Sequence, residues 1–512
     1  MTLRQFFPDA LLCRLRAAIL PGASVRVADN APVGSTVRKP SKIPGRTQAN
    51  LQARIPTRIP ATLLAGVGLV LCVGACSDGG PPPSRAAAGI AVTLPPIRTF
   101  ATAAALPPQR SNADMARDFL DLHFRLEGGS TLPVLTRFEM PVGVAVTGTP
   151  TPTLRPDLEA LVRRLRTEAG IDIRLTPPAR AQITIEAVSR DRIQRILPQA
   201  ACFVVPNVSS LDEYRRNRRA LQTDWKSLRS RDRLAIFVPG DVSPQELRDC
   251  LHEELAQALG PLNDLYRLPD SVFNDDNVHA ILTGFDMLML RATYDPALAT
   301  GMSRQQVEAR IPAILARLNP AGEARRSAPL PDTPRPWITA VETALGAYGS
   351  DAMRSRAAHE TARIARALGW RDHRRAFAHF LVGRSEQGRD SGLAQAHFRT
   401  ALSYLGQGPD TANHRALIQS RLASFALQAA EYDRAERLLD AAIPAARSGQ
   451  NAALLSSLLM LKARLADARG HRHEAATLRS DSVGWALYGL GTEATIDHQL
   501  RDRAVLITSA RR

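Results

Sequence analysis

One stretch of the chain, residues 250–264, has polar residues at a spacing that could support hydrolytic chemistry. It reads CLHEELAQALGPLND. Glu253 and Gln257 stand one helical turn apart, on the same face of a helix. Asn263 follows beyond a glycine, where a turn could bring a third donor toward the first two. Glu254, next to the first donor, would then be placed to act as general base on a metal-bound water.

This arrangement is similar to the ligand helix of metzincin zinc peptidases, which reads H-E-x-x-H-x-x-G-x-x-H. Aligned on Gly260, the pattern assigns its three ligand positions to residues other than histidine: Glu253, Gln257 and Asn263. Glu254 takes the position of the general base. Shifting the frame to His252 puts the second ligand at Ala256, which has no donor atom. The resemblance therefore covers the spacing and fails at every metal ligand.

Carboxylate and amide oxygens are hard ligands, which suit Ca²⁺ or Mg²⁺ better than Zn²⁺. One carboxylate and two neutral amides form a weak site even for those ions, so we expect no metal and no cofactor. We expect peptidase activity to be lost and the region to be kept as a groove for a peptide or protein, lined by Glu253, Gln257, Asn263 and Asp264. The alternative is an active hydrolase that uses Glu254 as general base with an atypical metal site. A plainer alternative is a solvated helix face with no site at all.

The residues around this helix predict an α+β, zincin-like domain over residues 111–319, with a mixed sheet and the long motif helix. Ser243, Pro244 and Glu246 have the pattern of a helix N-terminus, and the helix should run to Leu259. Two further helices are predicted from apolar periodicity, at residues 113–122 and 156–169. Strands are predicted at residues 135–146, 171–175, 182–188, 202–206 and 234–239. By the metzincin resemblance, the last of these should be the sheet edge that aligns substrate peptides.

Residues downstream of the motif extend the resemblance. Phe273 lies where metzincins carry the methionine of the Met-turn, and residues 282–286 open a predicted helix that ends near residue 296. The combination of these segments with the motif also resembles a proteobacterial lipoprotein family known as domain of unknown function 2927, over roughly residues 112–310. That family supplies no established activity. The resemblance implies that the Glu-Glu-x-x-Gln form is the family's own pattern.

Beyond a linker-like segment at residues 320–336, the sequence predicts only helices, over residues 337–512. A small-large-small signature recurs with starts 41 and 40 residues apart; its three copies are Ala394/Phe398/Ala401, Ala435/Leu439/Ala442 and Ala475/Arg479/Ser482. This spacing is typical of helical-hairpin repeats and resembles tetratricopeptide repeats. The alternative is a generic helical bundle. We expect this domain to provide a second surface for a protein partner.

The N-terminal region predicts export. Residues 61–75 are uncharged and apolar, follow Arg54 and Arg58, and end at Cys76. The segment resembles a bacterial lipobox, which implies that residues 1–75 are a signal region, with an over-extended start, and that Cys76 carries lipid. Residues 76–110 would then be a tether, and the protein would sit on the periplasmic face of the envelope, at the outer membrane. An ordinary signal peptide or an N-terminal anchor is the alternative.

Two cysteines remain after the signal region and Cys76, namely Cys202 and Cys250. A pair in an oxidising periplasm is a candidate disulfide. Two buried free thiols are the alternative.

The net charge of +17 first suggests a nucleic-acid partner. Residues 1–75 contain ten basic and two acidic residues, so +8 of this charge lies in the predicted signal region and +9 remains. The rest of the basic character is almost entirely arginine scattered along the chain. We therefore expect no nucleic-acid partner, and the sequence lacks phosphate-binding and serine-hydrolase motifs.

Overall fold

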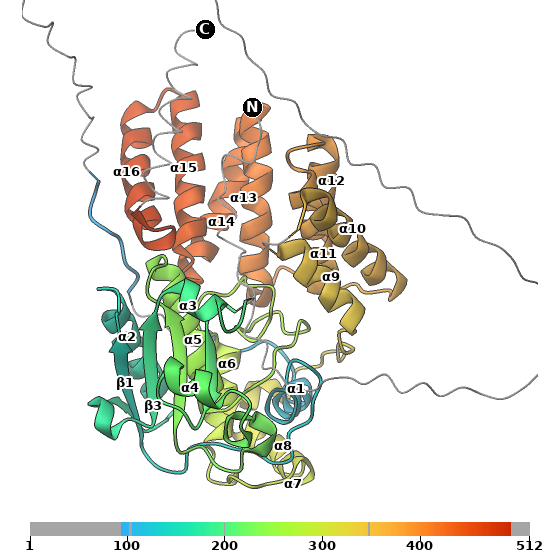
Figure 1. Cartoon of the computed structure of the whole chain (residues 1–512). Coiled ribbons are helices and arrows are strands. Elements are labelled where there is room, and N and C mark those ends of the chain that lie inside the picture. The colour runs from blue at the N-terminus through green and yellow to red at the C-terminus, as the bar shows by residue number, and fades with distance from the viewer. Residues whose placement is uncertain (1–93, 102–104, 199, 347–348, 493–512) are drawn as a thin grey trace, which may run out of the picture. The chain divides into compact units, whose positions relative to one another are not determined.

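A computed structural model of the chain describes four segments, residues 94–101, 105–198, 200–346 and 349–492 (Figure 1). The chain divides into two compact units, one of residues 1–22 with 93–512 and one of residues 23–92. The predicted signal region and Cys76 lie outside the described residues.

A five-stranded mixed sheet forms the centre of the α/β part, with the order β2-β1-β3-β5-β4. Its strands are β1 (Val142–Gly148), β2 (Ile173–Leu175), β3 (Ile183–Val188), β4 (Phe203–Pro206) and β5 (Leu234–Pro239). Strands β2, β1, β3 and β5 run parallel, and β4 pairs antiparallel with β5. In the register, Ile236 of β5 lies opposite both Ile185 of β3 and Val204 of β4. This is the mixed sheet that the sequence predicts.

Two strand predictions need correction. Residues 234–239 were expected at the sheet edge, but β5 lies between β3 and β4, and the edges are β2 and β4. All six residues of β5 are buried, and such an unbroken apolar run is typical of an interior strand. The strand predicted at residues 135–146 begins only at Val142, directly after Pro141.

Helices cover both faces of the sheet. They are α1 (Asn112–Phe124), α2 (Leu154–Glu168), α3 (Arg190–Gln194), α4 (Leu211–Asn217), α5 (Pro244–Leu259), α6 (Gly284–Thr293), α7 (Arg304–Glu308) and α8 (Ile311–Leu318). The main core contains the buried faces of α1, α2, α5 and α6, together with inward residues such as Ile185 and Ile236. A smaller core on the other face joins Phe203 and Phe237 to α3 and α4 through Ile193 and Leu211. Alternation along β3, β4 and β5 thus divides their side chains between the two cores.

The C-terminal part is all-helical, as predicted. Its helices are α9 (Arg335–Leu345), α10 (Asp351–Ala367), α11 (His373–Glu386), α12 (Ser391–Ser403), α13 (Ala412–Gln428), α14 (Tyr432–Ser448), α15 (Ala452–Ala468) and α16 (Arg472–Gly489). They pack as consecutive antiparallel pairs (Figure 1). Each copy of the small-large-small signature lies on the second helix of a pair, on α12, α14 or α16. Apart from Arg479, its members are fully or almost fully buried.

Side chains join the helical part to the α/β part within this unit. His414 Nε2 of α13 and Asp276 Oδ2, in the loop after α5, lie 2.6 Å apart, and both side chains are buried. The Tyr488 hydroxyl of α16 donates a hydrogen bond to Asp157 Oδ2 of α2 over 2.8 Å. Residues 320–336, which have the composition of a linker, are also attached to the α/β part, because Arg267 forms an ion pair with Asp332 at 2.9 Å. The loop after α5 therefore packs directly against the helical pairs.

In the described part of the chain, no helix has both the length and the hydropathy needed to cross a bilayer.

Candidate functional site

Helix α5 positions three of the predicted site residues: Glu253, Glu254 and Gln257. Its N-terminus forms as predicted, because the Ser243 side chain accepts a hydrogen bond from the Glu246 backbone N–H and Pro244 occupies the first turn. Helix α5 begins shortly after β5 ends and packs against β5, β4 and α2. Most of its residues are buried, so the helix lies within the core with only a narrow exposed face.

Glu254 is a buried carboxyl group. Its side chain is 3% exposed, and Oε2 has no hydrogen-bond partner. Burial raises its pKa well above 4.5, and the negative charges of Glu253, Glu127 and Asp264 raise the pKa further. Loss of hydration disfavours the charged form of any carboxyl group, and nearby carboxylates act in the same direction. The proton of Glu254 is therefore retained to higher pH than that of an exposed glutamate.

The two predicted amide ligands make hydrogen bonds within the fold. Gln257 Nε2 donates to Asp264 Oδ2 over 3.3 Å. Asn263 Nδ2 donates to the backbone carbonyl of Asp121, in α1, over 3.0 Å. These bonds fasten the loop that follows α5 to α5 itself and to α1. Gln257 and Asn263 thus hold the start of this loop in place.

The Zn²⁺ implied by the metzincin resemblance does not fit this set of residues. Thiolate and imidazole donors are absent from positions 253, 257 and 263, and the oxygens of the carboxyl group and two amides there are poor ligands for Zn²⁺. Among the described residues, no group of three or more histidine, cysteine, aspartate or glutamate side chains is placed to hold a metal ion. No hydrolytic step through a metal can be derived from this geometry.

The predicted groove residues differ in exposure. Glu254, Gln257 and Asn263 are each 5% exposed or less, whereas Glu253 and Asp264 are partly exposed. The residues that reach solvent here are therefore acidic.

His252 and Phe273 are both buried and pack within the fold. His252 Nδ1 accepts a hydrogen bond from the Leu282 backbone N–H over 3.1 Å, which ties α5 to the segment that leads into α6. Phe273, at the Met-turn position, is fully buried. Helix α6 begins where predicted, with Thr283 and Asp286 forming a capping box.

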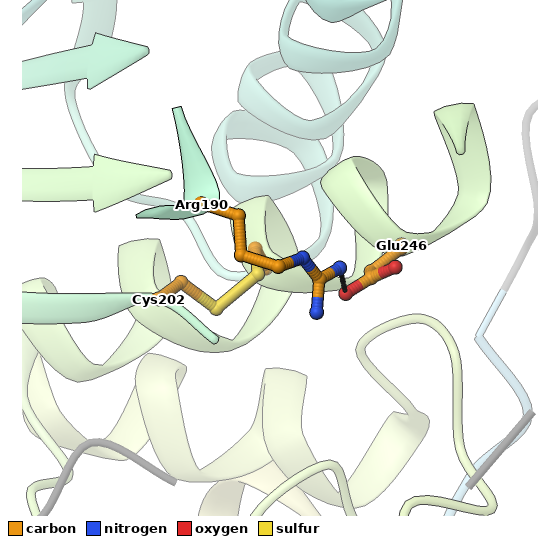
Figure 2. The surroundings of a disulfide bond; sticks show 4 residues. Arg190, Cys202 and Glu246 are labelled. Atoms are coloured by element: carbon orange, nitrogen blue, oxygen red, sulfur yellow. Dashed lines mark hydrogen bonds and ion pairs between the residues drawn. A yellow bond between two sulfur atoms is a disulfide. The ribbon is translucent and has the colours of Figure 1, made fainter. Parts of the chain in front are cut away.

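Cys202 and Cys250 form a disulfide, with their Cα atoms 6.0 Å apart (Figure 2). The bond joins the residue before β4 to the middle of α5, about one turn ahead of Glu253. Close to it, the guanidinium of Arg190 in α3 contacts the Glu246 carboxylate in α5 (Figure 2). Both contacts fix α5 to the β4 side of the sheet.

A basic cavity of about 520 Å³, which the sequence did not predict, lies beside α3 and α4. Its polar lining comes mainly from Arg192, Arg195, Arg215 and Arg218. The arginines at positions 215, 216, 218 and 219 are the signal in the sequence that could have indicated this cavity.

The α/β part is similar to a known family. Residues 112–313 match the model of a family described as protein of unknown function (DUF2927). The match starts at the first residue of α1 and ends within α8, so it includes the whole sheet, α5 and the loop after it. No curated protein and no solved structure matches the chain. Residues 112–313 are therefore similar to the family of unknown function that the sequence motifs predict.

Proposed function

We propose that the protein is a non-catalytic lipoprotein of the cell envelope that binds a peptide or protein partner. One observation carries the non-catalytic part of the proposal: positions 253, 257 and 263 offer none of the imidazole or thiolate donors that Zn²⁺ prefers. The side-chain NH2 groups of Gln257 and Asn263 donate hydrogen bonds that hold the loop after α5, and this structural role supports the same conclusion. The domain keeps the layout of a peptidase without the groups that perform the reaction.

The zincin-like assignment of the α/β part belongs to this proposal. It is supported by a mixed sheet with one antiparallel edge strand and by a long helix that follows the neighbouring strand β5. The repeat-like assignment of the helical part is supported by the signature residues, which lie on the second helix of successive pairs. Stacked helical pairs commonly present surfaces for protein partners.

The location in the envelope is proposed from the lipobox-like sequence at Cys76. The disulfide between Cys202 and Cys250 is compatible with an oxidising compartment. Cell fractionation tests the anchor: Cys76→Ser should move the protein from the membrane fraction to the soluble fraction. Continued membrane association of this variant would contradict lipidation at Cys76.

Metal analysis tests the non-catalytic proposal directly. The protein should be purified without chelators and its zinc, calcium and magnesium contents measured by mass spectrometry. We expect far less than one equivalent of zinc and no turnover of casein or mixed peptides. Near-stoichiometric zinc, or peptide cleavage that Glu254→Gln abolishes, would overturn the proposal.

An active hydrolase is the second candidate, and one observation favours it. Glu254 is a buried carboxyl group with a raised pKa and an oxygen that has no partner, and such groups are enriched at catalytic sites. On this reading, Glu254 would act as an acid in the first proton transfer. A pH profile distinguishes the two candidates, because hydrolysis by the acid form should fall as Glu254 loses its proton, whereas a binding protein should show no hydrolysis at any pH.

A further inference from the structure

The basic cavity beside α3 and α4 lies on the opposite face of the sheet from the main core. Four arginines line it together with Asp212 and two apolar residues, Ile196 and Leu211. Arg192 belongs to α3 and Arg215 to α4, while Arg195 and Arg218 directly follow these helices. We infer that this cavity binds a phosphate-bearing anion.

The charges around the cavity are not balanced. Arg192 pairs with Asp212 at 3.2 Å, and Arg195 pairs with Asp191 at 2.6 Å, but all four of these side chains are substantially exposed to water. For Arg215 and Arg218, the described part of the chain supplies no carboxylate within ion-pair distance. Two guanidinium groups therefore remain available for an external anion, and the other two are held only by weak surface pairs.

The floor of the cavity is fixed. Leu211 is 1% exposed and belongs to the smaller core. Its backbone N–H donates to Glu186 Oε2, in β3, over 2.6 Å, and Ser210 caps α4 through the Glu213 backbone N–H. The start of α4 is thus anchored to the sheet, so α4 presents Arg215 from a rigid support.

Phosphate is the anion that best fits this lining. A guanidinium group presents a planar fork of donors that can make two parallel bonds to phosphate, and a doubly charged phosphate can engage several guanidiniums at once. The volume of about 520 Å³ exceeds the needs of a simple inorganic ion and is in the range of small-molecule sites. Ile196 and Leu211 can contact an apolar part of the ligand next to its phosphate group.

Two sources share this chemistry: a free phosphorylated compound and the headgroup of an anionic lipid. The test uses the full chain with Cys76→Ser, so that no acyl chain on the protein can enter a vesicle. Calorimetric titration with inorganic pyrophosphate examines the free compound. Co-sedimentation with phosphatidylglycerol vesicles, against vesicles of phosphatidylcholine, examines the headgroup.

The chain offers a matched control for this test. The pocket variant is Arg215→Gln with Arg218→Gln, and the control is Arg216→Gln with Arg219→Gln, which removes the same charge from neighbouring exposed positions outside the lining. The pocket variant should bind about tenfold or more weakly, because it loses hydrogen bonds between charged groups, which are stronger than those between neutral groups. The control should stay within about twofold of the parent, as expected for exposed charges.

Each outcome of the test decides a point. Binding of pyrophosphate alone identifies a free phosphorylated compound, binding of the anionic vesicles alone identifies a headgroup, and binding of both supports the shared phosphate chemistry. Absence of binding in both arms would overturn the inference. The inference would also be overturned if the pocket and control variants lost the same affinity. It would be overturned as well if the protein preferred a single-stranded oligonucleotide and both variants weakened that binding alike. Either result would indicate a diffuse basic surface.

Discussion

Replacing Glu254 by glutamine should stabilise the protein at neutral pH. The Glu254 side chain is 3% exposed, and its Oε2 atom accepts no hydrogen bond. Burial raises its pKa, and Glu253, Glu127 and Asp264 add to this effect. Glutamine has nearly the same shape and stays neutral at every pH. The variant therefore avoids the free-energy cost of either burying a charged carboxylate or keeping the carboxyl group protonated at neutral pH.

The size and sign of the effect follow from proton linkage. Above pH 4.5, the unfolded chain releases the proton of Glu254 while the folded chain retains it, so the free energy of unfolding of the parent falls as the pH rises. The fall is at most about 1.4 kcal/mol per pH unit, and it ends at the pKa of the folded state. Glu254→Gln lacks this contribution. The difference in stability between variant and parent should therefore grow with pH over this window.

Urea denaturation followed by tryptophan fluorescence, at several pH values between 5 and 7, measures this difference. Comparing variant with parent at each pH cancels the titration of all other groups. Glu308, on α7, is exposed and provides a control. Glu308→Gln should change stability by less than about 0.5 kcal/mol at every pH. A Glu254→Gln variant whose stability relative to the parent is constant, or falls with pH, would show that Glu254 is ionised in the folded protein and would refute the reasoning.

Other predictions concern stability. Replacing both Cys202 and Cys250 by serine should lower the free energy of unfolding by about 4 kcal/mol, because the bridge spans a sequence separation of 48; urea denaturation measures the loss, and an unchanged midpoint would contradict it. Gly489→Ala should cost about 1–3 kcal/mol, since the new methyl group would lie 2.3 Å from a backbone nitrogen of α15; a melting temperature equal to the parent's would exclude this contact. The buried histidines should act in the opposite direction to Glu254, because burial lowers the pKa of His279 to about 3 and of His373 to about 4, so below pH 6.5 the unfolded chain binds protons that the folded chain excludes. Calorimetry should therefore show the melting temperature of the parent falling, relative to that of His279→Gln, from pH 7 to pH 5.

Local patterns made much of the fold predictable. Helix α2 buries its apolar face at Leu158, Leu161 and Leu165, and Gly170 follows with a φ of +70°, which glycine adopts without strain. The start of α5 followed from Ser243 and Pro244, because a cap depends only on neighbouring residues. The positions of most strands followed from short apolar runs bounded by turns. These features are local, so a single sequence contains them.

The order of the strands and the state of the candidate site were not predictable in the same way. The position of β5 between β3 and β4 depends on pairing between segments far apart in the chain. The burial of Glu254 depends on which segments pack against α5. Helical spacing gives only the relative directions of the side chains on that helix and does not say which segments cover each face. The basic cavity needs two short helices from separate segments to bring Arg192 and Arg215 together. Only the tertiary fold supplies that proximity.

The firm placement of α5 is not evidence for catalysis. The disulfide at Cys250 and the contact of Glu246 with Arg190 fix this helix to β4 and α3, and neither contact involves a group that could perform hydrolysis. A rigid helix is required equally by an enzyme and by a domain that only binds. What distinguishes the two is the chemistry at the ends of the side chains, where positions 253, 257 and 263 carry one carboxyl group and two amides in place of imidazoles. The donor atoms at these three positions, and not the positioning of the helix, therefore bear on the choice between binding and metal-assisted hydrolysis.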